Sequence, residues 1–101
     1  MAGMTREQII AVLRQHQAEL HALGVVRLSL FGSVARGEHG PESDVDIAAH
    51  FDPAAELSGF DIAGIEARLT EILGCEVDLV EEPVRRPSLK RALERDRVDA
   101  F

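Results

Sequence analysis

The segment from Asp44 to Phe51 constrains the fold of this chain more than any other. Its apolar residues stand at every second position, with polar or small residues between them: Val45, Ile47, Ala49 and Phe51 alternate with Asp44, Asp46, Ala48 and His50. Successive side chains of a β-strand point to opposite faces of a sheet. The alternation therefore predicts a strand that buries one face in the core and presents both aspartates on the other.

Helix and strand periodicities extend over the rest of the chain. We expect a helix to begin after Thr5, which can form a capping box with Gln8, and to continue to Gly24. The pattern also predicts strands at 25–31, 75–81 and 98–101, a helical turn at 33–36, a helix at 61–73 and a last helix after Pro87.

The order of these elements indicates the fold class. Helix, strand, strand, helix, strand and helix follow one another, which predicts an α/β (α+β) architecture in which helices back a small mixed β-sheet. Within the strand at 25–31, Val26, Leu28 and Leu30 are expected to share one face. A length of 101 residues suits one domain, so we expect residues 1–101 to form a single domain.

Composition argues against several classes of protein. The net charge of −7 argues against bulk nucleic-acid binding through a broad basic surface. No apolar run reaches the roughly 20 residues of a membrane span, and the N-terminus lacks the order of a signal peptide, so we expect a cytoplasmic protein. Cys75 is the single cysteine, which excludes an internal disulfide and a cysteine-based zinc cluster.

Cations gather near the C-terminus of this acidic chain. They are Arg85, Arg86, Lys90, Arg91, Arg95 and Arg97. Such a cluster either docks a partner or steadies a nucleotide, or it is a solvated helix face. The sequence leaves these interpretations open.

A Gly-Ser pair follows the strand at 25–31 directly. Gly32 allows backbone amides to approach an oxyanion closely, and Ser33 adds a hydroxyl donor. In the loop that follows, Ser43 is expected to cap the turn before the next strand. Of the four histidines, His16 is interpreted as a packing residue, and only His39 is retained as a candidate for the site.

Three aspartates in strands form the second part of a candidate site. Asp44 and Asp46 are two residues apart, so their Cα atoms lie about 6.5 to 7 Å apart on one face. Two carboxylates that close suit Mg²⁺, and a pair of ions could serve phosphoryl transfer. If the third strand lies beside the second, Asp78 joins them as a metal ligand, a general base or both.

Together these residues resemble a known motif. Residues 30–37 (LFGSVARG) and 43–47 (SDVDI) are similar to the Gly-Ser and Asp-x-Asp motif of the DNA polymerase β-like nucleotidyltransferase superfamily. The Ala35-Arg36-Gly37 inset and the short chain most resemble the minimal nucleotidyltransferases. These are commonly the antitoxin half of toxin–antitoxin pairs whose toxin is a helical HEPN ribonuclease.

The resemblance implies a role for each motif residue. Gly32 and Ser33 would hold the phosphates of ATP, and Asp44, Asp46 and Asp78 would be catalytic and would bind Mg²⁺. Arg36 would either neutralise a phosphate or pair with an acidic residue of the loop, Glu38 or Glu42. The sequence does not decide between these two roles.

The resemblance also implies a reaction. A nucleotidyltransferase of this kind would transfer AMP from ATP to a hydroxyl acceptor, here a tyrosine of a HEPN toxin, and would thereby act as antitoxin. Two alternatives remain: an antitoxin that neutralises by binding alone, and a stand-alone enzyme that modifies a small molecule. The oligomeric state is left open.

Overall fold

The computed structural model describes residues 4–40 and 42–101, and its centre is one four-stranded sheet with the order β3-β2-β1-β4. The strands are β1 (Val25–Phe31), β2 (Val45–Phe51), β3 (Val77–Glu81) and β4 (Val98–Asp99). β1 pairs antiparallel with β2 and with β4, whereas β2 and β3 are parallel. The sheet is therefore mixed, as the sequence predicts.

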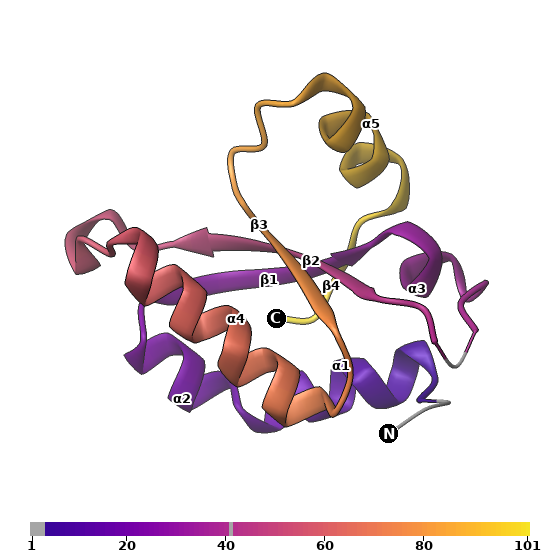
Figure 1. The fold of residues 1–101 in the computed structure, drawn as a ribbon, viewed down its shortest axis with the longest axis horizontal. Helices are drawn as coiled ribbons and strands as arrows, with labels where there is room; N and C mark the ends of the chain where they lie inside the picture. The colour runs from indigo at the N-terminus through magenta and orange to yellow at the C-terminus, as the bar shows by residue number, and fades with distance from the viewer. Residues whose placement is uncertain (1–3, 41) are drawn as a thin grey trace.

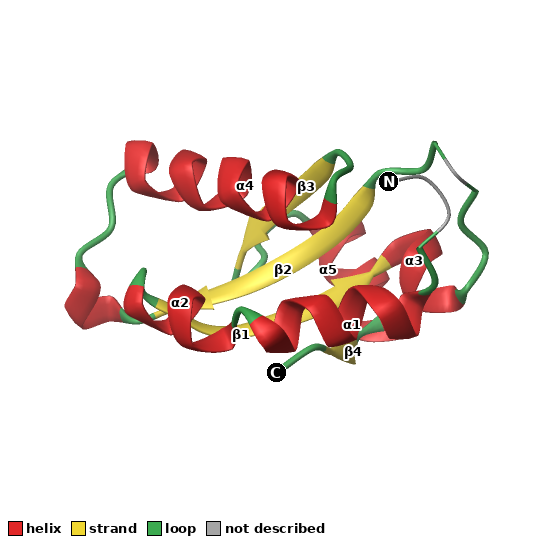
Figure 2. Ribbon diagram, turned by 90° about the horizontal axis from the view of Figure 1, so that it is seen from below, coloured by secondary structure: helices red, strands yellow, loops and turns green. Residues whose placement is uncertain are grey.

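Helices cover both faces of this sheet. They are α1 (Arg6–Gln15), α2 (Gln17–Ala22), α3 (Gly32–Arg36), the 3₁₀ turn η1 (Pro53–Ala55), α4 (Gly59–Leu73) and α5 (Pro87–Asp96). Figure 1 shows α1, α2 and α4 on one side of the strands and α5 on the other. Seen from below in Figure 2, α1, α2 and α4 lie in front of the strands and α5 lies behind them. No helix of the described residues is long and apolar enough to cross a membrane.

The main core lies between the sheet and the α1, α2 and α4 layer. The apolar face of β2, formed by Val45, Ile47, Ala49 and Phe51, belongs to this core, as the alternation predicts. A smaller cluster on the opposite face joins Phe31 and Ala48 to Leu93 of α5. The aspartates thus share a sheet face that α5 covers in part.

The first predicted helix is divided in two. The capping box is confirmed, because Gln8 N donates to Thr5 Oγ1 and Thr5 N donates to Gln8 Oε1. The expected continuation to Gly24 is wrong at His16, where α1 ends and α2 begins. The backbone amide of His16 donates to Leu13 O, a tighter bond than in an α-helix. The ring Nδ1 of His16 lies 2.9 Å from Val12 O, which accords with a packing role.

The predicted face of β1 is wrong at its first residues. Val26 is 49% exposed, whereas Val25 is 1% exposed and belongs to the core. The pairing of β1 with β2 shifts register between Val25 and Arg27. One extra residue in a strand reverses the alternation beyond it, so only Leu28 and Leu30 lie on the buried face that was predicted.

Candidate active site at the end of β1 and β2

The turn from β1 into α3 requires glycine at its first position. Gly32 has φ +71°, a left-handed conformation that other residues adopt only at a cost. A Cβ atom at this position would also overlap the carboxylate of Asp46. The Gly-Ser pair and the Asp-x-Asp pair, whose nearest members Ser33 and Asp44 are 11 residues apart in sequence, therefore meet in space.

Strand pairing brings Asp78 beside Asp46. The two residues are register partners in the parallel pair of β2 and β3, and neighbouring strands lie about 4.8 Å apart. Asp44 stands directly before β2 and two residues from Asp46. The condition on which the sequence analysis made Asp78 part of the site, that the third strand lies beside the second, is met.

The charges of these aspartates act on one another. Burial raises the pKa of Asp46 above its ordinary value, and the neighbouring carboxylates of Asp78 and Asp44 raise it further. The Arg36 guanidinium acts in the opposite direction and lowers the pKa of Asp46. Burial and the neighbouring carboxylates therefore both disfavour the charged form of Asp46.

The donor set has the chemistry of a magnesium site. Mg²⁺ prefers hard oxygen ligands and combines one or two carboxylates with substrate phosphates. Within the described residues no hydrogen bond or ion pair occupies the carboxylates of Asp44, Asp46 or Asp78. Over 4–40 and 42–101, however, no three Asp, Glu, His or Cys side chains are already arranged to hold an ion. The metal role of these aspartates stays a prediction.

Arg36 forms a contact that the sequence analysis missed. Its Nη1 donates to Asp96 at 2.7 Å, while its Nε lies 3.5 Å from Glu38. Of the two loop acids that the sequence offered as partners, the structure thus pairs Arg36 with Glu38. Asp96 is 60 residues further along the chain, and no local pattern could identify it.

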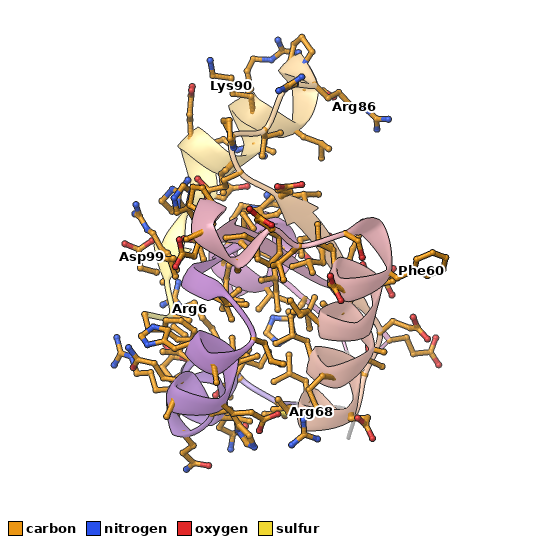
Figure 3. All side chains as sticks on the ribbon, turned by 90° about the vertical axis from the view of Figure 1, so that its left-hand side faces the viewer. Arg6, Phe60, Arg68, Arg86, Lys90 and Asp99 are labelled. Atoms are coloured by element: carbon orange, nitrogen blue, oxygen red, sulfur yellow. The ribbon has the colours of Figure 1, made fainter. Side chains whose placement is uncertain are left out.

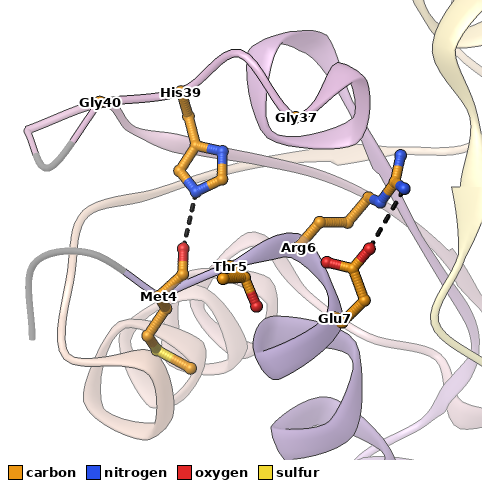
Figure 4. Close-up of a pocket in the computed structure, with 7 residues that line it drawn as sticks. All are labelled: Met4, Thr5, Arg6, Glu7, Gly37, His39 and Gly40. Atoms are coloured by element: carbon orange, nitrogen blue, oxygen red, sulfur yellow. Dashed lines mark hydrogen bonds and ion pairs between the residues drawn. The ribbon is translucent and has the colours of Figure 1, made fainter.

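The loop between α3 and β2 is held by its own side chains. The Gly40 amide donates to Ser43 Oγ at 2.9 Å, which agrees with the structural role predicted for Ser43. The ring Nε2 of His39 lies 2.7 Å from Met4 O and so ties the loop to the start of α1. A cavity of about 380 Å³ lies beside this contact, and the residues that line it include His39 but none of the three aspartates (Figure 4). The contact that the structure shows for His39 is therefore with Met4, and a role for His39 in the candidate site stays a prediction.

The C-terminal cations fall into two groups. Arg97 pairs with Glu82 at 2.6 Å and Arg95 pairs with Asp96 at 2.9 Å. The other four, Arg85, Arg86, Lys90 and Arg91, are exposed and have no ion pair with any described residue. Figure 3 shows Arg86 and Lys90 pointing away from the body of the protein. We call these four residues the basic patch.

The fold and the site together define a class of protein. A four-stranded mixed sheet backed by helices is the architecture of a minimal nucleotidyltransferase. The nucleotidyltransferase domain family matches residues 8–100, and this chain belongs to that family.

Known proteins of similar sequence and structure agree with this assignment. The protein adenylyltransferase MntA of Thermococcus cleftensis is 35% identical over 97 residues, which cover 95% of this chain and 96% of the relative. A solved structure provisionally described as a minimal nucleotidyltransferase has a TM-score of 0.78 and 31% identity, and the match covers 97% of this chain and 98% of the other.

A third similarity concerns the fold alone. It is to a chain in a crystal structure of a toxin–antitoxin with AMP-PNP, with a TM-score of 0.67 and 23% identity. The match covers 97% of this chain and 73% of the other.

Proposed function

We propose that this chain is a protein adenylyltransferase that transfers AMP from ATP to a tyrosine hydroxyl of a HEPN toxin and so acts as its antitoxin. One observation carries the proposal: Asp46 lies against Gly32 and beside Asp78. The closeness of the Gly-Ser turn to the carboxylates supports phosphoryl transfer, which needs phosphate-binding groups and acidic groups together. Membership of the nucleotidyltransferase family supports it.

The Gly32-Ser33 turn binds the triphosphate in this proposal. The absent Cβ of Gly32 lets the backbone approach phosphate oxygens, and Ser33 offers its hydroxyl as a further donor. Arg36, at the end of α3, contributes a positive charge to the same region. Phosphate oxygens bound here bring the α-phosphate towards Asp46.

Asp44, Asp46 and Asp78 supply the acidic half of the site. They would hold Mg²⁺, which when bound neutralises phosphate charge and favours ionisation of the attacking hydroxyl. The acceptor oxygen forms a bond to the α-phosphorus, the bond from that phosphorus to the bridging oxygen breaks, and pyrophosphate leaves. Asp78 is the candidate acceptor of the hydroxyl proton, because it is exposed and is the register partner of Asp46 on the neighbouring strand.

The protein acceptor is inferred from the relatives and from the charge distribution. A 35% identical relative is named a protein adenylyltransferase, and the fold recurs in a toxin–antitoxin structure that contains AMP-PNP. The basic patch projects from a chain whose net charge is −7, so it suits an acidic protein surface. These observations favour a protein over a small molecule as acceptor.

The basic patch also favours a second candidate function, antitoxin activity by binding alone. The four cations of the patch contact no described residue through an ion pair, so they are available to a partner whether or not AMP is transferred. Neutralisation by binding would not need Asp44, Asp46 or Asp78.

One experiment separates the two functions. The protein is incubated with ATP, Mg²⁺ and a HEPN toxin encoded beside its gene, and the toxin is analysed by intact mass and peptide mapping. Addition of AMP to a tyrosine, with release of pyrophosphate and loss of ribonuclease activity, is the expected result. Ribonuclease inhibition with an unmodified toxin would support binding alone and would overturn the transfer proposal.

A further inference from the structure

Asp96 occupies an unfavourable position for a carboxylate. It is the last residue of α5, where the helix dipole is negative, and its side chain is only 3% exposed. A negative charge placed there needs compensation to be tolerated. The structure supplies it through two arginines.

The two arginines approach Asp96 from different elements. Arg95 is its neighbour in sequence and donates to it from Nε and Nη2 at 2.9 and 3.0 Å. Arg36 is the last residue of α3 and donates from Nη1 at 2.7 Å. The hydrogen bonds from Arg95 have the largest effect on the pKa of Asp96, and together with the bond from Arg36 they hold it below its ordinary value. Burial acts in the opposite direction and does not outweigh them. Asp96 is therefore a fixed anion to which Arg36 is attached.

Arg36 joins this anion to the helix that begins at the candidate site. α3 begins at Gly32, the residue that lies against Asp46, and ends at Arg36. Hydrogen bonds to Glu38 and Asp96 leave part of the Arg36 guanidinium unused. Its Nη2 makes no hydrogen bond to any described residue, so a donor remains for a further oxygen. The Arg36 side chain is 36% exposed, and a free arginine of that exposure would sample many rotamers.

We propose that Asp96 is a positioning residue that holds the Arg36 guanidinium at the end of the short helix that begins at Gly32, so that Arg36 binds a phosphate oxygen of the nucleotide. This inference rests on the proposed function, because it assigns Arg36 to the nucleotide of that reaction. The ordering cost of Arg36 is met when the chain folds and not when ATP binds, so Asp96 improves ATP binding without touching ATP.

The test measures the Kd of Mg-ATP for the isolated protein by calorimetry, together with the melting temperature of each variant. Asp96→Asn removes the anion at nearly constant volume and should raise the Kd about tenfold, the effect expected when one charge-assisted hydrogen bond is lost. Arg36→Gln should raise it by at least as much. In the double variant Asp96→Asn/Arg36→Gln, the Kd should equal that of Arg36→Gln alone, because Asp96 acts only through Arg36.

Glu82→Gln is the matched control. Glu82 accepts from Arg97 at 2.6 Å, so this variant also breaks an ion pair at the C-terminal end of α5, but it leaves Arg36 untouched. It should lower the melting temperature and leave the Kd unchanged. A Kd raised equally by Glu82→Gln and Asp96→Asn would mean that Asp96 merely anchors α5, and would overturn the inference.

Asp96→Glu is the variant to measure if Asp96→Asn does not fold. It keeps the charge and moves the carboxylate by one methylene, and it should raise the Kd about threefold, a fraction of one charge-assisted hydrogen bond. An unchanged Kd in Asp96→Glu, or in a folded Asp96→Asn, overturns this inference and leaves the proposed function standing. Wild-type protein that binds Mg-ATP but transfers no AMP contradicts the proposed function while the inference stands. Wild-type protein that binds no Mg-ATP overturns both.

Discussion

Asp46 of β2 and Asp78 of β3 are register partners in a parallel strand pair, which places two carboxylates side by side. Parallel neighbours cannot move apart without loss of the hydrogen bonds between their strands. The fold therefore holds like charges together, and burial adds to the cost at Asp46. Carboxylates held close together at an electrostatic cost are typical of functional sites, where the residue is kept for its chemistry and not for stability.

Asp46→Asn should abolish AMP transfer and stabilise the protein at neutral pH. The substitution removes a ligand from the proposed metal site at little change in volume, and transfer should fall about 100-fold or more, the scale on which single groups act in such reactions. It also removes a charge repelled by Asp78 and Asp44, so the melting temperature of the metal-free protein should rise. Glu42→Gln, which removes an exposed charge from the preceding loop, is the control and should change neither quantity. Near-normal transfer by Asp46→Asn would contradict the metal assignment.

The stabilisation by Asp46→Asn should depend on pH. The pKa of Asp46 is raised in the folded state, so folding favours its protonated form. That contribution to stability is complete below the ordinary carboxyl pKa and is lost as the pH rises through the raised value. The melting temperatures of variant and wild type should therefore converge in acid and separate towards neutral pH. An equal difference at every pH would show that charge is not the cause.

Gly32→Ala should impair both folding and nucleotide binding. The left-handed backbone alone costs about 1–2 kcal/mol for a residue with a Cβ, and the Cβ would displace the Asp46 carboxylate. The control is Gly64→Ala in α4, where a Cβ would meet no atom within 4 Å. Because alanine favours helix, that variant should gain about 0.5–1 kcal/mol. Chemical denaturation and Mg-ATP titration measure the two effects, and a Gly32→Ala protein with wild-type stability and affinity would contradict the geometry.

Mg²⁺ with ATP should raise the melting temperature more than ATP alone. Triphosphate and the three aspartates repel one another until a cation lies between them, and a ligand that binds only the folded state stabilises it by mass action. Thermal scans with ATP, with Mg²⁺ and with both provide the comparison. The extra shift should disappear in Asp44→Asn. Equal shifts with and without Mg²⁺ would count against a bridging ion.

Reversing two charges of the basic patch should slow partner association. Lys90 and Arg91 are exposed and have no ion pair within the described chain, so Lys90→Glu/Arg91→Glu should leave the fold and Mg-ATP binding intact. Surface charges mainly alter the association rate and its salt dependence, and the rate should fall about tenfold or more at low salt and less at high salt. Arg95 is unsuitable for this test because it pairs with Asp96. Equal rates for the two proteins at low salt would identify the patch as a solvated helix face.

Local patterns were sufficient where neighbouring residues decide the outcome. The capping box of Thr5 and Gln8 and the buried face of β2 follow from spacing alone. The division of the first helix at His16 did not follow, because apolar spacing continues through it while a backbone bond to Leu13 tightens the turn. The face of Val26 was mistaken for a similar reason: a register shift depends on the partner strand, which the local alternation does not describe.

The sequence by itself determined which residues are candidates for the site, because Gly-Ser after a strand and two aspartates at strand spacing are properties of short segments. Only the tertiary structure decided how they meet. It set Asp78 opposite Asp46, put the Asp46 carboxylate where a Cβ of Gly32 would stand, and joined Arg36 to Asp96 across 60 residues. Such contacts depend on strand order and on the packing of α5 against α3, and side-chain periodicity carries no information about partners distant in sequence.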